Sequence, residues 1–397
     1  MKRPPALPAE EVPAARRVNS DRFIPSKASP VNFKVCGEAT RGEYGQGLNT
    51  LLGDNSLEEP LTPLCSKRKV LFFGSQSRCG SATRSKVDHC AQFDGRELKV
   101  LDAPGMLDSF YNNLLAFSSE NVLAVGLGSD LHLFRFSATR SLPLFSDPAA
   151  ALTAICFSNT NPAVLAFASQ KGVVRVAETN GGAVLRQLPS DGNRVVALAW
   201  QGELLATGTK HGQALLRDLR CKAPSVLTLA PHTQEVCTLA FNSFDAHYLL
   251  SGSNDDSVAL TDLRSPHREA ARFTHHRAAV KALSWHPLKR GLFASGGGAR
   301  DQTLAVVDAY HREVLRSSHL GTQICNLGFS REGHLLVATG FPGCSLQVRD
   351  ARSLTELHAF TGHCDRLLYF SLAADRCVAA TGSPDQTIRY WSVAELR

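Results

Sequence analysis

The sequence predicts an all-β protein: a seven-bladed β-propeller that follows a largely disordered N-terminal segment. Three observations support this. From about residue 98 onward, apolar runs of strand length alternate with short polar turns. One aromatic residue recurs in each unit, at intervals of 40, 43, 41, 44, 44 and 41 residues. This period matches the ~40–45 residues of a four-stranded propeller blade.

The unit at residues 232–264 is the template for the others. Apolar runs at 235–241, 248–252 and 258–263 are predicted strands, and polar turns separate them. Seven first strands fit this template, and their aromatic anchors are Phe117, Phe157, Trp200, Phe241, Trp285, Phe329 and Phe370. Most third strands end in X-Asp, so the Trp-Asp dipeptide of WD40 propellers has largely decayed while the period remains.

The last blade is incomplete at its C-terminal end. Only six residues follow Trp391, too few for a turn and an outer strand of about five residues. An open blade would expose unpaired backbone groups at the seam of the ring. We therefore expect the strand beginning at Leu98 and ending at Leu101 to close the ring. The predicted propeller spans residues 98–391, and residues 392–397 form a tail.

Two polar residue types recur at fixed points of the repeat. A histidine precedes the first strand at His232, His276 and His363, and an aspartate occupies the turn between the second and third strands at Asp255, Asp301 and Asp385. Because catalytic groups should occur once rather than once per blade, we interpret these residues as a structural hydrogen-bond network and not as a Ser-His-Asp triad.

Residues 1–97 differ in composition from the rest. They are rich in Pro, Ser, Gly and charge and lack periodicity, which predicts disorder in the free protein. They carry 15 Lys and Arg against 11 Asp and Glu, leaving +3 of the net charge of +7 for the propeller. So diffuse a charge argues against nucleic-acid binding.

Other composition signals set further limits. No apolar run reaches the ~18 residues of a membrane span. The 11 cysteines include no CxxC pair, and no His/Cys set has the spacing of a metal site, so we expect no metal and no cofactor. Scattered cysteines such as Cys156, Cys237 and Cys325 suit a reducing compartment, and we expect a location in nucleus and cytoplasm.

Several motifs together resemble the Fizzy/Fizzy-related family, the substrate-recognising coactivators of the anaphase-promoting complex. They are SDRFIPSK at 20–27, LNTLLGD at 48–54, KVLDAP at 99–104, DSFYNNL at 108–114, HRAAVKALSWHP at 276–287 and ASGGG at 294–298. The resemblance runs from Ser20 to the C-terminus and is nearer the Fizzy-related branch. It implies a non-enzymatic, monomeric adaptor that binds ligase subunits and degron-bearing cell-cycle proteins.

The resemblance assigns three stretches to ligase docking. The C-box-like motif contributes Asp21, Arg22, Phe23, Ile24 and Pro25, in which Pro25 holds Ile24 extended and lowers the cost of ordering. The Leu-rich stretch contributes Leu51 and Leu52, and the C-terminus contributes Leu396 and Arg397. Ser29-Pro30, Thr62-Pro63 and Ser265-Pro266 are candidate phosphorylation sites, and a phosphate at Ser29 would oppose docking of the neighbouring motif.

The resemblance also implies a KEN-box receptor and a destruction-box groove on the propeller. Tyr111, Asn254, Asp256 and Arg366 match the KEN receptor. Leu101, Asp102 and Gln386 match the groove. Gln386 stands where the family carries an acid, Ala299 replaces a Thr, and PGCS at 342–345 replaces a Gln-containing turn. We therefore expect weakened or altered degron binding.

Three alternatives remain open. A divergent relative could keep the scaffold and act as an inhibitor or a specialised meiotic form. A generic WD40 scaffold would lack the C-box-like motif. An enzyme fits least, since the glycine run at 296–298 does not join a strand to a helix as a phosphate-binding loop does.

Overall fold

The computed structural model describes residues 93, 95–138, 140–189, 193–221, 226–266 and 268–395, and the backbone of Val35 and Cys36. All of these belong to one compact unit, Met1–Cys36 with Ala91–Arg397. The second unit, Gly37–Cys90, lies outside the described residues. So does the rest of the segment predicted to be disordered, apart from the few positions just named. The C-box-like motif, Leu51, Leu52, Leu396 and Arg397 therefore also lie outside the described residues.

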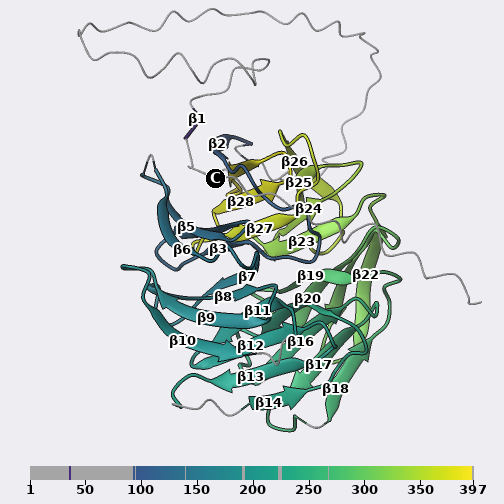
Figure 1. The fold of residues 1–397 in the computed structure, drawn as a ribbon. Helices are drawn as coiled ribbons and strands as arrows, with labels where there is room; N and C mark the ends of the chain where they lie inside the picture. The colour runs from purple at the N-terminus through teal and green to yellow at the C-terminus, as the bar shows by residue number, and fades with distance from the viewer. Residues whose placement is uncertain are drawn as a thin grey trace, which may run out of the picture. The chain divides into compact units, whose positions relative to one another are not determined.

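The described residues form seven antiparallel sheets that follow one another around a ring, as predicted (Figure 1). Blade 1 is β3 (Leu115–Phe117), β4 (Val122–Leu127), β5 (Asp130–Arg135) and β6 (Leu142–Ser146). Blade 2 is β7 (Leu152–Phe157), β8 (Val164–Ser169), β9 (Val173–Glu178) and β10 (Val184–Pro189). Blade 3 is β11 (Val195–Gln201), β12 (Leu204–Thr209), β13 (Ala214–Asp218) and β14 (Val226–Leu229).

The remaining blades repeat this order. Blade 4 is β15 (Val236–Phe241), β16 (Tyr248–Ser253), β17 (Val258–Asp262) and β18 (Glu269–Phe273). Blade 5 is β19 (Val280–Trp285), β20 (Leu292–Gly297), β21 (Thr303–Asp308) and β22 (Glu313–His319). Blade 6 is β23 (Ile324–Phe329), β24 (Leu335–Thr339), β25 (Ser345–Arg349) and β26 (Glu356–Thr361). Blade 7 begins with β27 (Tyr369–Leu372), β28 (Val378–Ser383) and β29 (Thr387–Ser392).

The seam of the ring closes as the residue count predicted. Strand β2 (Glu97–Asp102) pairs antiparallel with β29, with Leu101 opposite Ile388 and Asp102 opposite Thr387. In Figure 1 the blue β2 lies among the yellow strands of the C-terminal sheet. The two-residue β1 (Val35–Cys36) pairs with the outer side of β2. An N-terminal strand therefore completes the last blade and removes the open edge at the seam.

Apolar clusters fill the space between neighbouring blades. At the seam, Leu101, Ile388 and Tyr390 are at most 1% exposed and belong to one cluster with Phe134. Such burial at the seam makes closure depend on packing as well as on backbone pairing. Between blades 5 and 6 the approach is so close that a Cβ on Gly296 would lie 2.4 Å from Ile324.

The glycine run at 296–298 has a packing role, which the sequence did not predict. Gly297 ends β20, and a Cβ there would lie 1.8 Å from the carboxylate of Asp301. Gly296 is required by the neighbouring blade, as described above. These contacts account for two glycines of the run without a phosphate.

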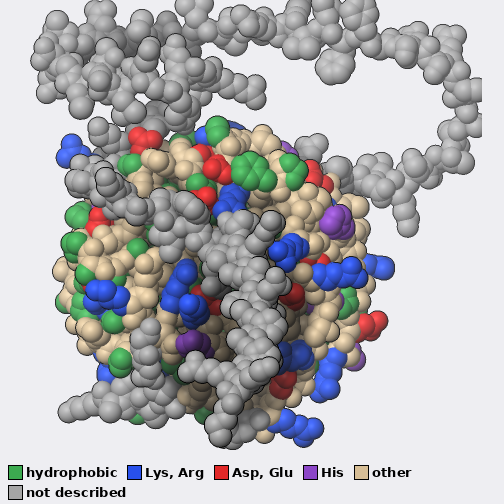
Figure 2. All heavy atoms as spheres, turned by 45° about the vertical axis from the view of Figure 1, so that its right-hand side comes forward, with side chains coloured by type: hydrophobic (Ala, Val, Ile, Leu, Met, Phe, Trp, Pro, Cys, Tyr) green, Lys and Arg blue, Asp and Glu red, His purple; other side chains and the backbone are tan. Residues whose placement is uncertain are grey.

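Antiparallel strands give the ring two distinct ends. We call the end with the turns between second and third strands the b–c face, and the opposite end, with the turns between first and second strands, the a–b face. On the face visible in Figure 2, Lys and Arg side chains are intermixed with Asp and Glu. In the described part of the chain, no helix has the length and apolar character needed to cross a membrane.

Candidate functional site

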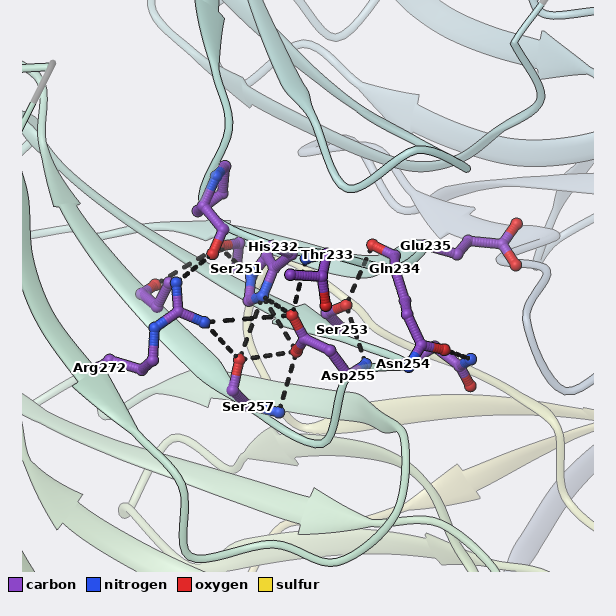
Figure 3. Close-up of polar contacts among 12 residues, drawn as sticks. His232, Thr233, Gln234, Glu235, Ser251, Ser253, Asn254, Asp255, Ser257 and Arg272 are labelled. Carbon is purple, nitrogen blue, oxygen red and sulfur yellow. Dashed lines mark hydrogen bonds and ion pairs between the residues drawn. The ribbon is translucent and has the colours of Figure 1, made fainter.

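The b–c face is built on the repeated His-Asp pairs. In blade 4, Nδ1 of His232 lies 3.1 Å from Oδ2 of Asp255, and Nε2 lies 2.8 Å from Oγ of Ser251. Asp255 also accepts hydrogen bonds from the hydroxyl of Ser257 and the backbone N–H of Thr233. Figure 3 shows the His232 ring enclosed by these partners. Each polar group of this buried network is therefore satisfied, as the structural interpretation required.

Blades 5 and 7 repeat the same arrangement. His276 and His363 contact Asp301 and Asp385 at 2.5 and 2.8 Å. Burial raises the pKa of Asp385, but hydrogen bonds from His363 and Thr387 outweigh it and hold the pKa at about 2. The aspartates are thus ionised acceptors that fix the b–c turns, and a catalytic role is not needed to explain them.

A segment at residues 103–114 crosses the central axis on the b–c face. Asn113 donates to the backbone oxygens of Val196 (3.0 Å) and Cys237 (3.4 Å), in blades 3 and 4. The hydroxyl of Tyr369, in blade 7, donates to the carbonyl of Leu107 at 2.6 Å. The segment therefore holds side chains of the DSFYNNL motif over the middle of the ring.

A buried lysine supports this segment from below. Lys281 is 1% exposed, its Nζ donates to the carbonyl of Leu368 at 2.8 Å, and it lies 5.5 Å from the ring centres of both Phe110 and Tyr369. Burial lowers its pKa to about 8. Cation–π contacts of this kind favour the charged form in a dry site. Lys281 lies in the HRAAVKALSWHP motif, for which the sequence predicts no role beyond that of a strand.

Asn254 is held at both ends of its amide. Its Oδ1 accepts a hydrogen bond from the hydroxyl of Tyr111 at 2.8 Å, although the two residues are 143 positions apart. Its Nδ2 donates to Oε1 of Gln234 at 2.6 Å, and its backbone N–H donates to the carbonyl of Glu235. Figure 3 shows Gln234 beside Asn254. The structure thus brings together two predicted KEN-receptor residues, and adds Gln234, which the resemblance did not assign to this receptor.

The other two predicted KEN-receptor residues differ in their surroundings. Arg366 contacts Oδ1 of Asp108 through Nη2 at 2.7 Å and Nε at 3.1 Å, which ties it to the central segment. Asp256 is half-buried and forms no ion pair among the described residues. Burial and the nearby Asp255 and Asp301 carboxylates raise its pKa. Of the residues in this group, Asp256 is therefore the one whose unfavourable negative charge a cationic ligand would stabilise most.

Asp256 shares an unusual backbone conformation with other b–c turns. Gly172 and Gly212 have φ of 75° and 81° in blades 2 and 3, whereas blades 4, 5 and 7 place Asp256 (67°), Gln302 (54°) and Gln386 (64°) there. A non-glycine residue in this left-handed region costs about 1–2 kcal/mol. The same conformation occurs at Asn121, Arg312, Leu354 and Arg376 at the other end of the ring, so it fixes the direction of these side chains and does not by itself mark a functional surface.

The predicted destruction-box residues form a second group at the seam. Leu101 is fully buried, so its side chain packs in the core beneath the surface. Asp102 is half-buried, and Gln386 is exposed. The carbonyl of Gln386 accepts a hydrogen bond from the backbone of Ala103 at 2.7 Å, directly after Asp102. The exposed face of this group therefore consists of Asp102 and Gln386. Ala299 is also exposed, and offers no polar side chain.

The C-terminal residues that the structure describes belong to the propeller. Val393 is fully buried and its N–H donates to the carbonyl of Cys377, while Glu395 bridges to Phe93 and approaches His334 at 3.4 Å. Hence Ser392, which ends β29, as well as Val393 and Glu395 belong to the ring, although the prediction placed them in the tail. Within the described residues, no group of His, Cys, Asp and Glu could hold a metal, and seven cysteines are free thiols.

Comparison with known proteins gives a consistent result. A family model described as the CDC20/Fizzy WD40 domain matches residues 101–391. Protein FIZZY-RELATED 2 of Arabidopsis thaliana is 30% identical, over 96% of this chain and 84% of that protein. APC/C activator protein CDH1 of Saccharomyces cerevisiae is 33% identical, over 74% of this chain and 52% of that protein. A chain in the crystal structure of the mitotic checkpoint complex aligns with a TM-score of 0.73 at 29% identity, covering 83% of this chain and 99% of that one.

Proposed function

Since the chain belongs to the CDC20/Fizzy family of WD40 proteins, we propose that it is a coactivator and substrate adaptor of the anaphase-promoting complex. It would hold degron-bearing cell-cycle proteins on its b–c face and promote their ubiquitination. The observation that carries the proposal is the family match over the whole propeller, joined by a relative named as an activator of this ligase.

The KEN box would bind around Asn254. The amide is oriented by Tyr111 and Gln234, so a peptide would meet a preformed polar group rather than a mobile one. Arg366, fixed by Asp108, supplies a guanidinium for a carboxylate of the peptide. Asp256 supplies a carboxylate for its cation. These charges support a K-E-N sequence, which contains one cationic, one acidic and one amide side chain.

The destruction box would bind at the seam, beside Asp102 and Gln386. A neutral Gln386 offers the degron's arginine a weaker partner than a carboxylate would, so we expect reduced affinity at this groove. Leu101 would act from beneath, by shaping the surface through its buried packing.

The adaptor would act through proximity and not through chemistry of its own. Holding the substrate beside the ligase raises the effective concentration of the acceptor lysines. His232, Asp255 and their equivalents serve the framework of the blades, which supports a non-enzymatic role. We further propose that the chain acts as a monomer in nucleus and cytoplasm, where its free thiols would stay reduced.

Docking to the ligase would use Asp21, Arg22, Phe23, Ile24 and Pro25, the Leu-rich stretch with Leu51 and Leu52, and the terminal Leu396 and Arg397. These residues lie outside the described part of the chain, and their role rests on the family resemblance.

A retention experiment tests the proposal. Purified anaphase-promoting complex is immobilised and incubated with wild type, Arg22→Ala and a variant lacking Leu396 and Arg397. We expect strong retention of the wild type and a clear loss for both variants. If wild type and Arg22→Ala are both absent from the bound fraction, the proposed function is wrong and the generic scaffold gains support. If wild type binds but does not activate ubiquitination, the chain is instead a divergent inhibitor of the ligase.

A further inference from the structure

The a–b face carries a repeated exposed position. In six blades, the first residue after the inner strand donates its N–H to the carbonyl of the first residue of the next strand, or in blade 6 to that of His334 just before it. The residue two positions later is exposed to solvent. Four of the six blades place a polar side chain there: Glu120, Thr160, Glu332 and Asp375. Only blades 4 and 5, which are neighbours, place large apolar side chains, Phe244 and Leu288.

The turns hold these two apolar side chains outward. Oδ1 of Asn242 accepts hydrogen bonds from the N–H groups of Phe244 (2.8 Å) and Asp245 (3.2 Å). Nδ1 of His286 accepts them from Leu288 (3.0 Å) and Lys289 (3.1 Å) in the same way. Phe244 is 48% exposed and Leu288 is 61% exposed. Capped turns do not let the side chains fold back into the core, so the surface is preorganised.

A third exposed side chain lies between the two turns. Tyr310 is 38% exposed in the outer turn of blade 5, and its hydroxyl donates to Asp245. Arg290 also binds Asp245, with Nε at 2.9 Å. Asp245 directly follows Phe244, and Arg290 lies two residues after Leu288. The contacts among Asp245, Arg290 and Tyr310 therefore link the three segments that carry the exposed apolar side chains. We call Phe244, Leu288 and Tyr310 the blade 4–5 patch.

The charges beside the patch are cationic. Within two residues of its members, the exposed charged side chains are Lys289, Arg290 and Arg312. Asp245 forms an ion pair with Arg290, so these two charges offset each other, and Asp308 contacts His311; Lys289 and Arg312 are therefore the exposed cations that remain beside the patch. The patch is thus an apolar centre with a positive rim, which complements an acidic segment that carries large apolar side chains.

We propose that the blade 4–5 patch docks the propeller onto such an acidic, apolar segment of the ligase. The proposal rests on the proposed function. Asn254 and Gln386 lie on the b–c face, at the opposite end of the strands, so the patch stays accessible while a substrate is bound. A partner that must remain bound through successive substrates would use this end of the ring. The patch would then fix the orientation of the propeller on the ligase, as a further contact beside the motifs proposed for docking.

The test uses purified anaphase-promoting complex and full-length protein. The double variant Phe244→Thr/Leu288→Thr introduces at both positions the residue that blade 2 has in Thr160. The matched control Glu120→Thr changes the same repeat position in blade 1. We expect the double variant to bind the ligase roughly tenfold more weakly, with the control unchanged, because exposed apolar anchors at an interface centre commonly carry such an effect. Lys289→Gln/Arg312→Gln should reduce the dependence of binding on salt.

The possible outcomes separate this proposal from the proposed function. If Arg22→Ala loses binding while the double variant binds like wild type, the patch proposal is overturned and the coactivator role stands. If wild type does not bind the ligase, both are overturned. A double variant that weakens a KEN-box peptide instead would assign the patch to substrates. Loss of a concentration-dependent dimer in sedimentation would assign it to a second copy. Either result overturns the ligase as occupant.

Discussion

Replacing Tyr111 by Phe tests the geometry of the KEN receptor with the smallest possible change. The substitution removes one hydroxyl, which donates to Oδ1 of Asn254 at 2.8 Å. The ring itself is 1% exposed and packs edge-on against Phe110 at 5.4 Å, and this packing is retained. Asn254 keeps its second bond, to Gln234, but its carbonyl end loses its anchor.

The expected loss follows from the worth of one hydrogen bond. A net contribution of about 1 kcal/mol corresponds to a roughly fivefold weaker affinity. Fluorescence anisotropy with a labelled KEN-box peptide measures the change, and thermal unfolding checks that Tyr111→Phe remains folded. A destruction-box peptide is the control, because Asp102 and Gln386 form a separate group at the seam. An unchanged or tighter KEN affinity, or an equal loss for both peptides, would refute the reasoning.

Three further predictions concern single positions. Burial lowers the pKa of His286 to about 4, against ~6.5 in the unfolded chain, so the unfolded state binds the extra proton and the free energy of unfolding falls as the pH drops from about 6.5 to 4. The variant His286→Asn keeps the turn capped, as Asn242 does in blade 4, and should reduce this pH dependence in urea unfolding. An unchanged pH dependence would count against the prediction. Arg217 donates a hydrogen bond to Thr207 as Trp391 does to Thr381. In the same assay, Arg217→Ala should lower the free energy of unfolding by about 2–4 kcal/mol, and Arg217→Trp should lower it less. Equal losses for the two variants would contradict the equivalence of the two positions. Gln386→Glu should tighten a destruction-box peptide by about 1.4- to 5-fold, as an exposed ion pair does, and no gain would sink the idea.

The repeat made most of the fold predictable. The aromatic period predicted all seven inner strands, and the N-terminal closing strand that was expected for the last blade is β2, which pairs with β29. Periodicity works here because each blade meets the same packing constraint. For the same reason, His232 and Asp255 could be assigned to the framework before any geometry was known.

What the repeat could not give are contacts that occur once. The bond between Tyr111 and Asn254 joins residues 143 positions apart, and no local pattern signals it. Arg217 in blade 3 occupies the position that Trp391 occupies in blade 7 and donates the equivalent hydrogen bond, although the two side chains differ in chemical class. Asn254 and Asp256 were predicted as a pair, but the first is tied at both ends and the second has a raised pKa. The two residues differ in their surroundings, which their positions in the sequence do not reveal.

Apolar residues at turn positions are a further case. Phe244 and Leu288 lie in polar-looking segments and break the blade template only slightly. At the same turn position, four other blades carry polar side chains, which sets these two residues apart. In five of the six blades this position lies three residues after the aromatic anchor, so the sequence allows most of the comparison; only the position of Asp375 in blade 7 depends on the hydrogen bonds of the structure.

A reconstituted ubiquitination assay tests the central claim most directly. Purified anaphase-promoting complex, a conjugating enzyme and a substrate with an intact KEN box are combined with and without this chain. We expect ubiquitination of the substrate to require this protein, to decrease with Tyr111→Phe, and to be lost with Arg22→Ala or with a substrate whose KEN box is replaced by alanines. Substrate modification that is the same with and without the chain would contradict it.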